Sequence, residues 1–287
     1  MPHDLARDMS TRTIFALTSG RSGTLSLREL LKRNARHCTV KHENHNNVCN
    51  PPMFGRAIYD HTTGCLDAVR ALLCRKRRTI DWYRRPTYIE TSHAFLKSYW
   101  DLAPEFFPQT KVFHLIRNPL EVARSEENRE QWLNRIHAPD RRYRGRDGRL
   151  YTRWALTGLE PIFSSFELSQ LTLFQRYLIQ WIEIENRAME YLRRFDMHDR
   201  CLTVHSPQEL NSPQAAAAIL DFAGIGRKGE LSLPGIQNRT SAYETILGED
   251  ELRQCRDVVA ALPATYLEIF QHEPYAGQAW AALLTKS

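Results

Sequence analysis

Short apolar runs alternate with segments of helical periodicity along most of this chain. Runs at residues 13–18, 38–41, 87–91, 111–116 and 201–204 have the length and composition of buried strands. Helical spacing is found in residues 213–222 and 249–262, in a long apolar stripe from Leu171 to Leu192, and in a leucine set at Leu25, Leu27, Leu30 and Leu31. This alternation predicts an α/β fold with a central parallel β-sheet flanked by helices.

Two segments interrupt the alternation. Residues 137–161 mix proline, glycine and arginine, which predicts a long loop or lid between larger elements. Residues 226–248 begin with glycine, proline and basic residues, and we expect them to form a C-terminal lid over a ligand. A chain of 287 residues is long for one domain, but α/β folds reach this length, so we expect a single domain over residues 1–287.

The composition is that of an ordinary globular protein, with 42% hydrophobic and 25% charged residues. No apolar run approaches the ~18 residues of a membrane span, and the first residues are charged rather than signal-like, so we expect a cytoplasmic protein. The six cysteines are widely spaced without a Cys-x-x-Cys pair, which favours reduced thiols over disulfides or a zinc site.

A net charge of +6 favours anionic partners but is modest for this length, and it does not predict a nucleic-acid partner. Two basic runs stand out, at residues 75–78 with 84–85 and at residues 141–149. We interpret both as solvated loops. The alternative is that they form the binding surface of a non-catalytic polyanion-binding protein.

The strand at residues 13–18 leads directly into Ser19-Gly20-Arg21-Ser22-Gly23-Thr24 and then into a helix. A glycine-bearing loop at a helix N-terminus presents free backbone amides and the positive end of the helix dipole to one point, which suits an anion. Ser22 and Thr24 add hydroxyl donors, and Arg21 adds a cation. The loop lacks the Gly-Lys pair of a Walker A sequence, which disfavours ATP with magnesium.

A second motif follows the strand at residues 111–116. The strand ends in Arg117-Asn118-Pro119, where the proline suits a helix start, and Ser125 follows the arginine by eight positions. Arg117 thus lies at the carboxyl end of a strand and Ser125 two turns into the next helix. Both side chains are expected to face the crevice into which the glycine loop opens.

Together the two motifs resemble those of the sulfotransferases that use 3′-phosphoadenosine 5′-phosphosulfate (PAPS), which have a P-loop nucleotide-kinase-like fold. The resemblance implies that Arg117 and Ser125 hold the 3′-phosphate of PAPS. It also implies a metal-free 5′-phosphosulfate loop formed by Gly20, Arg21, Ser22, Gly23, Thr24 and Leu25. Later landmarks of the family are similar to Trp181 and to residues 203–205 and 219–225.

The C-terminal part departs from the family pattern. Arg227-Lys228-Gly229 spells a phosphate-binding motif of the cytosolic branch, but it follows the preceding helix closely and its context does not match. In the same lid segment, Arg239 is a second candidate for a phosphate contact.

The resemblance places the catalytic base at one of two positions. Glu43 follows the second strand, where bacterial and Golgi-type members place a glutamate, and His93 follows the third, where the cytosolic branch places a histidine. We favour Glu43, whose pKa would have to be raised by burial; the remaining alternatives are His42, His45 and Glu90. By analogy with phosphoryl transfer, Arg21 would neutralise the departing oxygen. A metal site of His37, His42 and His45 is disfavoured because cysteine partners and helical spacing are missing.

The sequence therefore predicts a sulfotransferase that moves a sulfuryl group from PAPS to a hydroxyl or amine by in-line displacement. The acceptor, a carbohydrate, lipid or small molecule, stays open, as does the oligomeric state. Besides the polyanion-binding protein, the alternative is a nucleotide-dependent kinase of similar fold. A kinase would require a loop lysine and an acidic metal-binding strand end, and the sequence shows neither.

Overall fold

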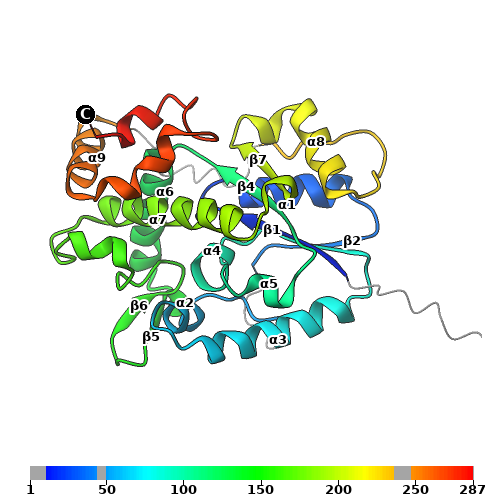
Figure 1. Ribbon diagram of the computed structural model, residues 1–287, viewed down its shortest axis with the longest axis horizontal. Coiled ribbons are helices and arrows are strands. Elements are labelled where there is room, and N and C mark those ends of the chain that lie inside the picture. Colours follow the sequence, from blue (N-terminus) through cyan, green and yellow to red (C-terminus); the bar gives the residue numbers. More distant parts are fainter. Residues whose placement is uncertain (1–10, 44–49, 236–246, 287) are drawn as a thin grey trace, which may run out of the picture.

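A computed structural model describes residues 11–43, 50–235 and 247–286. Its centre is a five-stranded sheet in the order β2-β3-β1-β4-β7, with all neighbours parallel (Figure 1). The strands are β1 (Arg12–Leu17), β2 (Cys38–Lys41), β3 (Thr87–Glu90), β4 (Lys111–Ile116) and β7 (Cys201–His205). These are the five apolar runs of the sequence, and the predicted parallel α/β sheet is confirmed.

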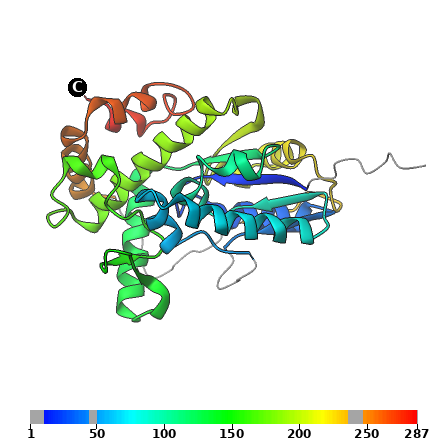
Figure 2. The same cartoon turned by 60° about the horizontal axis from the view of Figure 1, so that its bottom comes forward.

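Alternation along β1 divides the core into two layers, because successive side chains of a strand point to opposite faces. Ile14 and Ala16 pack on one face under α1 (Thr24–Asn34) and α8 (Pro213–Ala223). Phe15 and Leu17 pack on the other, with α3 (Leu66–Trp82), α4 (Phe95–Ser98), α5 (Ala103–Phe106) and α7 (Leu173–Arg194). Figure 2 shows helices on both sides of the sheet.

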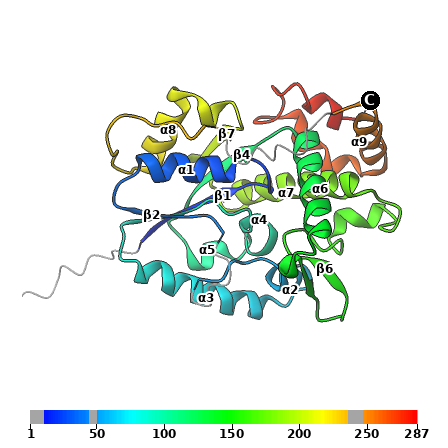
Figure 3. The same cartoon turned by 180° about the vertical axis from the view of Figure 1, so that it is seen from behind.

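The long apolar stripe forms α7, which begins at a capping box between Thr172 and Gln175. Against α7 lie α6 (Pro119–Arg135), which starts at the predicted proline, and α9 (Glu249–Ala261), as seen from behind in Figure 3. Two further elements are α2 (Arg56–Thr62) and the hairpin described next. Short 3-10 turns lie at Pro139–Arg141, Pro161–Ser165, His198–Arg200, Glu209–Asn211, Ala264–Tyr266, Glu268–Gln271 and Ala281–Leu284.

Residues 137–161, the expected long loop or lid, contain secondary structure that the sequence does not predict. Their centre is an antiparallel hairpin of β5 (Arg142–Arg144) and β6 (Leu150–Thr152). Tyr143 and Tyr151 stack across the two strands with ring centroids 5.8 Å apart, and Gly148 turns the chain with a φ of 80°. Cross-strand aromatic packing stabilises a hairpin whose glycines and arginines hide its strand pattern.

The basic run at residues 75–78 is also not a loop, because it lies inside α3. Lys76 is fully buried there, and its ammonium group lies 2.6 Å from a carboxylate oxygen of Glu90 on β3. The run thus contributes one cation to the core. No helix within residues 11–43, 50–235 and 247–286 is long and apolar enough to cross a membrane.

Candidate active site

The loop between β1 and α1 is tightly wound. Arg21 and Gly23 have positive φ angles of 62° and 92°, and the Ser19 and Ser22 hydroxyls lie 2.9 Å apart. A Cβ atom on Gly23 would lie 2.4 Å from the Ser206 hydroxyl, so only glycine fits between the loop and the end of β7. The first-turn amides of α1 have no acceptor inside the helix and face the loop, as an anion site requires.

The structure brings this loop to the second motif. The Arg21 Nε atom donates to the Ser125 hydroxyl at 2.9 Å, and the Arg117 guanidinium donates to the Arg21 carbonyl at 2.9 Å. Arg117 also forms an ion pair of 2.8 Å with Glu121 on α6. Arg21 therefore lies beside Arg117 and Ser125, which are 96 and 104 positions later in the chain, and all three are expected to contact one nucleotide.

The two candidate bases are partners. His93 Nε2 lies 3.1 Å from a carboxylate oxygen of Glu43, at the adjacent carboxyl ends of β3 and β2. His42 lies 3.7 Å from the same carboxylate, and Phe54 packs on the His93 ring with centroids 4.7 Å apart. His45 lies outside the described residues.

Glu90, a weaker alternative for the base, lies in the core. Its carboxylate accepts hydrogen bonds from Lys76 and from the Tyr88 hydroxyl, and the side chain is buried. A carboxylate with two such donors is already satisfied, so the structure favours a structural role for Glu90.

The protonation of the Glu43 pair is set by its surroundings. Burial would raise the pKa of Glu43, but the hydrogen bond from His93 and the nearby histidines outweigh it and lower that pKa below its usual value. Burial, together with the positive charge of Lys97, lowers the pKa of His93 to about 4. At neutral pH, a neutral His93 therefore donates to an ionised Glu43. The expected upward shift at Glu43 is not found.

Beside the loop lies a cluster of charged groups that the sequence did not predict. The Glu126 carboxylate is so close to Gly20 that a Cβ atom there would lie 1.9 Å from its oxygen. Arg129 pairs with Glu126 at 3.1 Å, and the fully buried Lys97 donates to the Trp154 carbonyl at 2.6 Å. Burial lowers the pKa of Lys97 to about 8. This charged cluster (Lys97, Glu126, Arg129) borders both the loop and the Glu43 pair.

Two members of the cluster had a weak signal in the sequence. Arg129 follows Ser125 by four positions on α6, a spacing that puts the two side chains on one helix face, and Lys97 follows His93 closely in the sequence. Glu126 had no such signal, because only tertiary packing shows that it turns towards Gly20.

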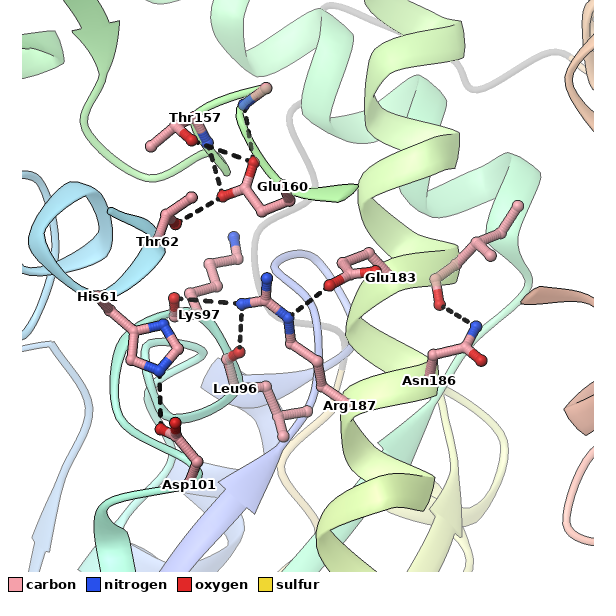
Figure 4. A network of polar contacts seen from close by, with 12 residues as sticks. His61, Thr62, Leu96, Lys97, Asp101, Thr157, Glu160, Glu183, Asn186 and Arg187 are labelled. Carbon is pink, nitrogen blue, oxygen red and sulfur yellow. Dashed lines mark hydrogen bonds and ion pairs between the residues drawn. The ribbon is translucent and has the colours of Figure 1, made fainter. Parts of the chain in front are cut away.

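A second network holds Lys97 in place (Figure 4). Arg187 on α7 pairs with Glu183 at 2.8 Å and donates to the carbonyl of Leu96 at 3.1 Å. In the same view, the Glu160 carboxylate accepts hydrogen bonds from the Thr62 hydroxyl and from the backbone amides of Thr157 and Gly158. The backbone that carries Lys97 is therefore anchored to α7.

The C-terminal basic motif lies elsewhere. The backbone amide of Lys228 bonds to Asn34, its ammonium group bonds to the Lys32 carbonyl, and Arg227 pairs with Asp221. Lys32 and Asn34 lie at the C-terminal end of α1, one helix length from the glycine loop, and Asp221 lies in the last turn of α8. This position agrees with the expectation that Arg227-Lys228-Gly229 is not the family motif. Arg239 lies outside the described residues, as do residues 236–246 of the expected lid.

Among the described residues, no three His, Cys, Asp or Glu side chains are grouped as metal ligands. The first strand-to-helix loop offers hydroxyls, amides and arginine as donors to a bound group. Neither observation adds support to the kinase alternative.

No protein-family model and no curated protein sequence matches this chain. It is similar to the crystal structure of a sulfotransferase from Alicyclobacillus acidocaldarius, with 16% identity, a TM-score of 0.44 and coverage of 88% of this chain and 94% of that one. It is similar at a TM-score of 0.44 to the sulfotransferase domain of the curacin biosynthetic pathway (13% identity; 84% and 82% covered). The same TM-score relates it to the sulfotransferase domain of the Synechococcus PCC 7002 olefin synthase (18% identity; 96% and 93% covered). All three are sulfotransferases, the family whose two motifs this sequence resembles.

Proposed function

We propose that this chain transfers a sulfuryl group from PAPS to an acceptor hydroxyl or amine. The observation that carries the proposal is the direct contact between the two motifs: Arg21 of the glycine loop bonds to Ser125, and Arg117 bonds to the Arg21 carbonyl. Two phosphate-binding motifs in contact suit one ligand with phosphates at two positions of a nucleotide.

In this proposal the glycine loop holds the 5′-phosphosulfate. Backbone amides from Gly20 to Leu25 and the hydroxyls of Ser22 and Thr24 are its donors, with the dipole of α1 behind them. Arg117 and Ser125 hold the 3′-phosphate, and Arg239 is a further proposed contact. The hydrogen bond between Arg21 and Ser125 places the two side chains next to each other, between the two proposed phosphate sites.

The transfer step breaks one bond and forms one. The acceptor oxygen attacks sulfur in line, its proton passes to the base, and the bond from sulfur to the bridging phosphate oxygen breaks. The electron pair stays on that oxygen as 3′-phosphoadenosine 5′-phosphate (PAP) leaves. Because a sulfuryl group carries less charge than a phosphoryl group, Arg21 and the ammonium of Lys97 suffice to balance the charge that develops.

We assign the base to Glu43 and the positioning of its carboxylate to His93. The Glu43 side chain is 14% exposed and that of His93 is 3% exposed, so an acceptor approaches the carboxylate more readily than the imidazole. With His93 donating to one side, the carboxylate is oriented to accept the acceptor proton. Its lowered pKa makes it a weak base, so the assignment rests on position and access.

An acceptor screen with sulfur-labelled PAPS tests the proposal. The purified chain is incubated with labelled PAPS and pools of phenols, sugars, hydroxylated lipids and amines, and labelled products are separated by chromatography. We expect label in at least one organic product, together with stoichiometric PAP. Failure of the chain to bind PAP at all would contradict the proposal, whatever the acceptor.

A further inference from the structure

A cavity of about 290 Å³ lies between the β5–β6 hairpin, the second half of α6 and the start of α7. This volume is close to the lower end of the ~300–1,000 Å³ range of small-molecule sites. Most of its wall is apolar, with contributions from Leu150, Leu156, Leu159, Phe163, Leu168 and Leu173. The cavity therefore suits a compact apolar group.

Three arginines from different segments line the same cavity: Arg142 on β5, Arg149 before β6, and Arg176 on α7. Within the described part of the chain, none of the three guanidinium groups has a hydrogen-bond or ion-pair partner. Neighbours in the same basic run are engaged, since Arg141 donates to the Leu133 carbonyl and Arg146 to Asp60. The cavity thus brings two unpaired arginines of this run together with one of α7.

The inner wall of the cavity adjoins the charged cluster. Glu130, in this wall, directly follows Arg129, and Ala155 directly follows Trp154. Arg129 pairs with Glu126 and lies 4.8 Å from the centre of the Trp154 ring, whose backbone carbonyl binds Lys97. Tyr177 in the cavity wall interacts electrostatically with Glu126 and Arg129, so the cavity adjoins the charged cluster that borders the Glu43 pair.

The one carboxylate among the residues that line the cavity accepts hydrogen bonds from uncharged groups. Glu130 accepts hydrogen bonds from the hydroxyls of Tyr177 and Thr152, so no arginine of the cavity neutralises it. The three arginines therefore supply the unpaired charge of the wall, and the Thr152 and Tyr177 hydroxyls with the Glu130 carboxylate form a second polar group in the same wall. A ligand that carries both an anionic group and a hydroxyl group complements this lining.

We infer that the cavity binds a small anionic amphiphile, an apolar body with a phosphate, sulfate or carboxylate group on the arginines, and that this is the acceptor class. Guanidinium groups suit such oxyanions because their fork geometry allows paired hydrogen bonds. The binding site itself is independent of the proposed function. Its role as acceptor site rests on that function, because the hydroxyl end would have to reach Glu43.

Calorimetric titration with octyl phosphate tests the binding site. We expect saturable binding, with weaker or no binding of 1-octanol and of inorganic phosphate, because each lacks one of the two features. Arg149→Ala and Arg176→Ala should each weaken octyl phosphate binding about threefold to tenfold, since the arginines are exposed. Arg193→Ala, at the other end of α7, is the matched control and should leave it unchanged.

Equal binding of octyl phosphate by the wild type and both cavity variants would overturn the inference. So would binding to vesicles of phosphatidic acid without binding to octyl phosphate, since that would make the arginines a membrane surface.

The acceptor role is tested separately, with 8-hydroxyoctyl phosphate, 1,8-octanediol and labelled PAPS. We expect the hydroxyl group of 8-hydroxyoctyl phosphate to be sulfated faster than those of 1,8-octanediol. Arg149→Ala and Arg176→Ala should lose this preference. Arginine-dependent binding without sulfation, in a chain that binds PAP, would overturn the acceptor role alone. Binding of octyl phosphate without binding of PAP would instead contradict the proposed function and leave the cavity site standing.

Discussion

Glu43 and His93 share one hydrogen bond, so a single substitution at either position changes both groups. Glu43→Gln keeps the shape but removes the base, and we expect kcat to fall by about 10²–10⁴ at saturating PAPS, with PAP affinity nearly unchanged. His93→Asn should lower kcat less, because a carboxylate remains at position 43. Steady-state kinetics and PAP titration on both variants provide the measurement.

The opposite ranking would place the proton transfer on His93. A nearly silent Glu43→Gln beside an inactive His93→Asn would show that the imidazole accepts the proton and that Glu43 orients it.

Gly20 lies against the charged cluster, and there is no room for a side chain at this position. Gly20→Ala places a Cβ atom 1.9 Å from the Glu126 carboxylate, and we expect a loss of about 1–3 kcal/mol in the free energy of unfolding from overpacking. Chemical denaturation measures this loss. Gly277→Ala is the control, because a Cβ atom there meets nothing within 4 Å. If the contact is responsible, Gly20→Ala should cost less in a Glu126→Ala background.

Lys97 should give the proposed reaction a pH dependence. Burial lowers its pKa to about 8, so its ammonium group is present below that pH and is lost as the pH rises through it. Because the proposed role needs the positive charge, we expect kcat to fall above about pH 8. Lys97→Met should have a lower kcat without this alkaline decline. An unchanged decline in the variant would assign it to another group.

At the scale of elements, the second motif lies on the segment from β4 to α6. Its contribution to nucleotide binding can be measured by comparing nucleotides with and without a 3′-phosphate. We expect Arg117→Ala to weaken PAP binding by up to about 3 kcal/mol, and Ser125→Ala to weaken it less, because the arginine contact is charge-assisted. Adenosine 5′-phosphate lacks the 3′-phosphate, so its affinity should distinguish the variants from the wild type far less. Equal losses for both nucleotides would show that these residues do not hold the 3′-phosphate.

Elements with strong patterns were predictable, and those held by tertiary contacts were not. The five strands and the long α7 follow from apolar runs and from a continuous stripe. The β5–β6 hairpin was missed because arginine and glycine hide its alternation, and α3 because its basic run suggests a solvated loop. Lys76 is buried in α3 through its pair with Glu90, a partner that no local pattern indicates.

The candidate site shows the same division. The glycine loop, Arg117 and Ser125 were identified from local motifs, and the structure brings them together. The contact of Glu43 with His93 depends on strand order, since β2 and β3 are neighbours in the sheet but distant in the sequence. The position of Glu126 against Gly20 depends on how α6 packs, so it was not predictable.

At the scale of the whole molecule, the parallel strands bring the segments of the candidate site together at the carboxyl-terminal edge of the sheet. The loop after β1, the turn after β4, and the ends of β2 and β3 all lie at the carboxyl ends of parallel strands. Ligands of open α/β sheets bind at this edge. The hairpin and α7 add the arginine-lined cavity next to it, so donor and acceptor sites would adjoin without overlapping.

The most direct test of the central claim is a comparison of PAP and ATP by thermal unfolding. A ligand that binds only the folded chain stabilises it by about 2.7 kcal/mol at a hundred times its dissociation constant. We predict that PAP raises the melting temperature in a concentration-dependent way and that ATP and NAD at equal concentrations do not match it. An equal shift with ATP, or no shift with PAP, would contradict the assignment of this site to a sulfuryl donor.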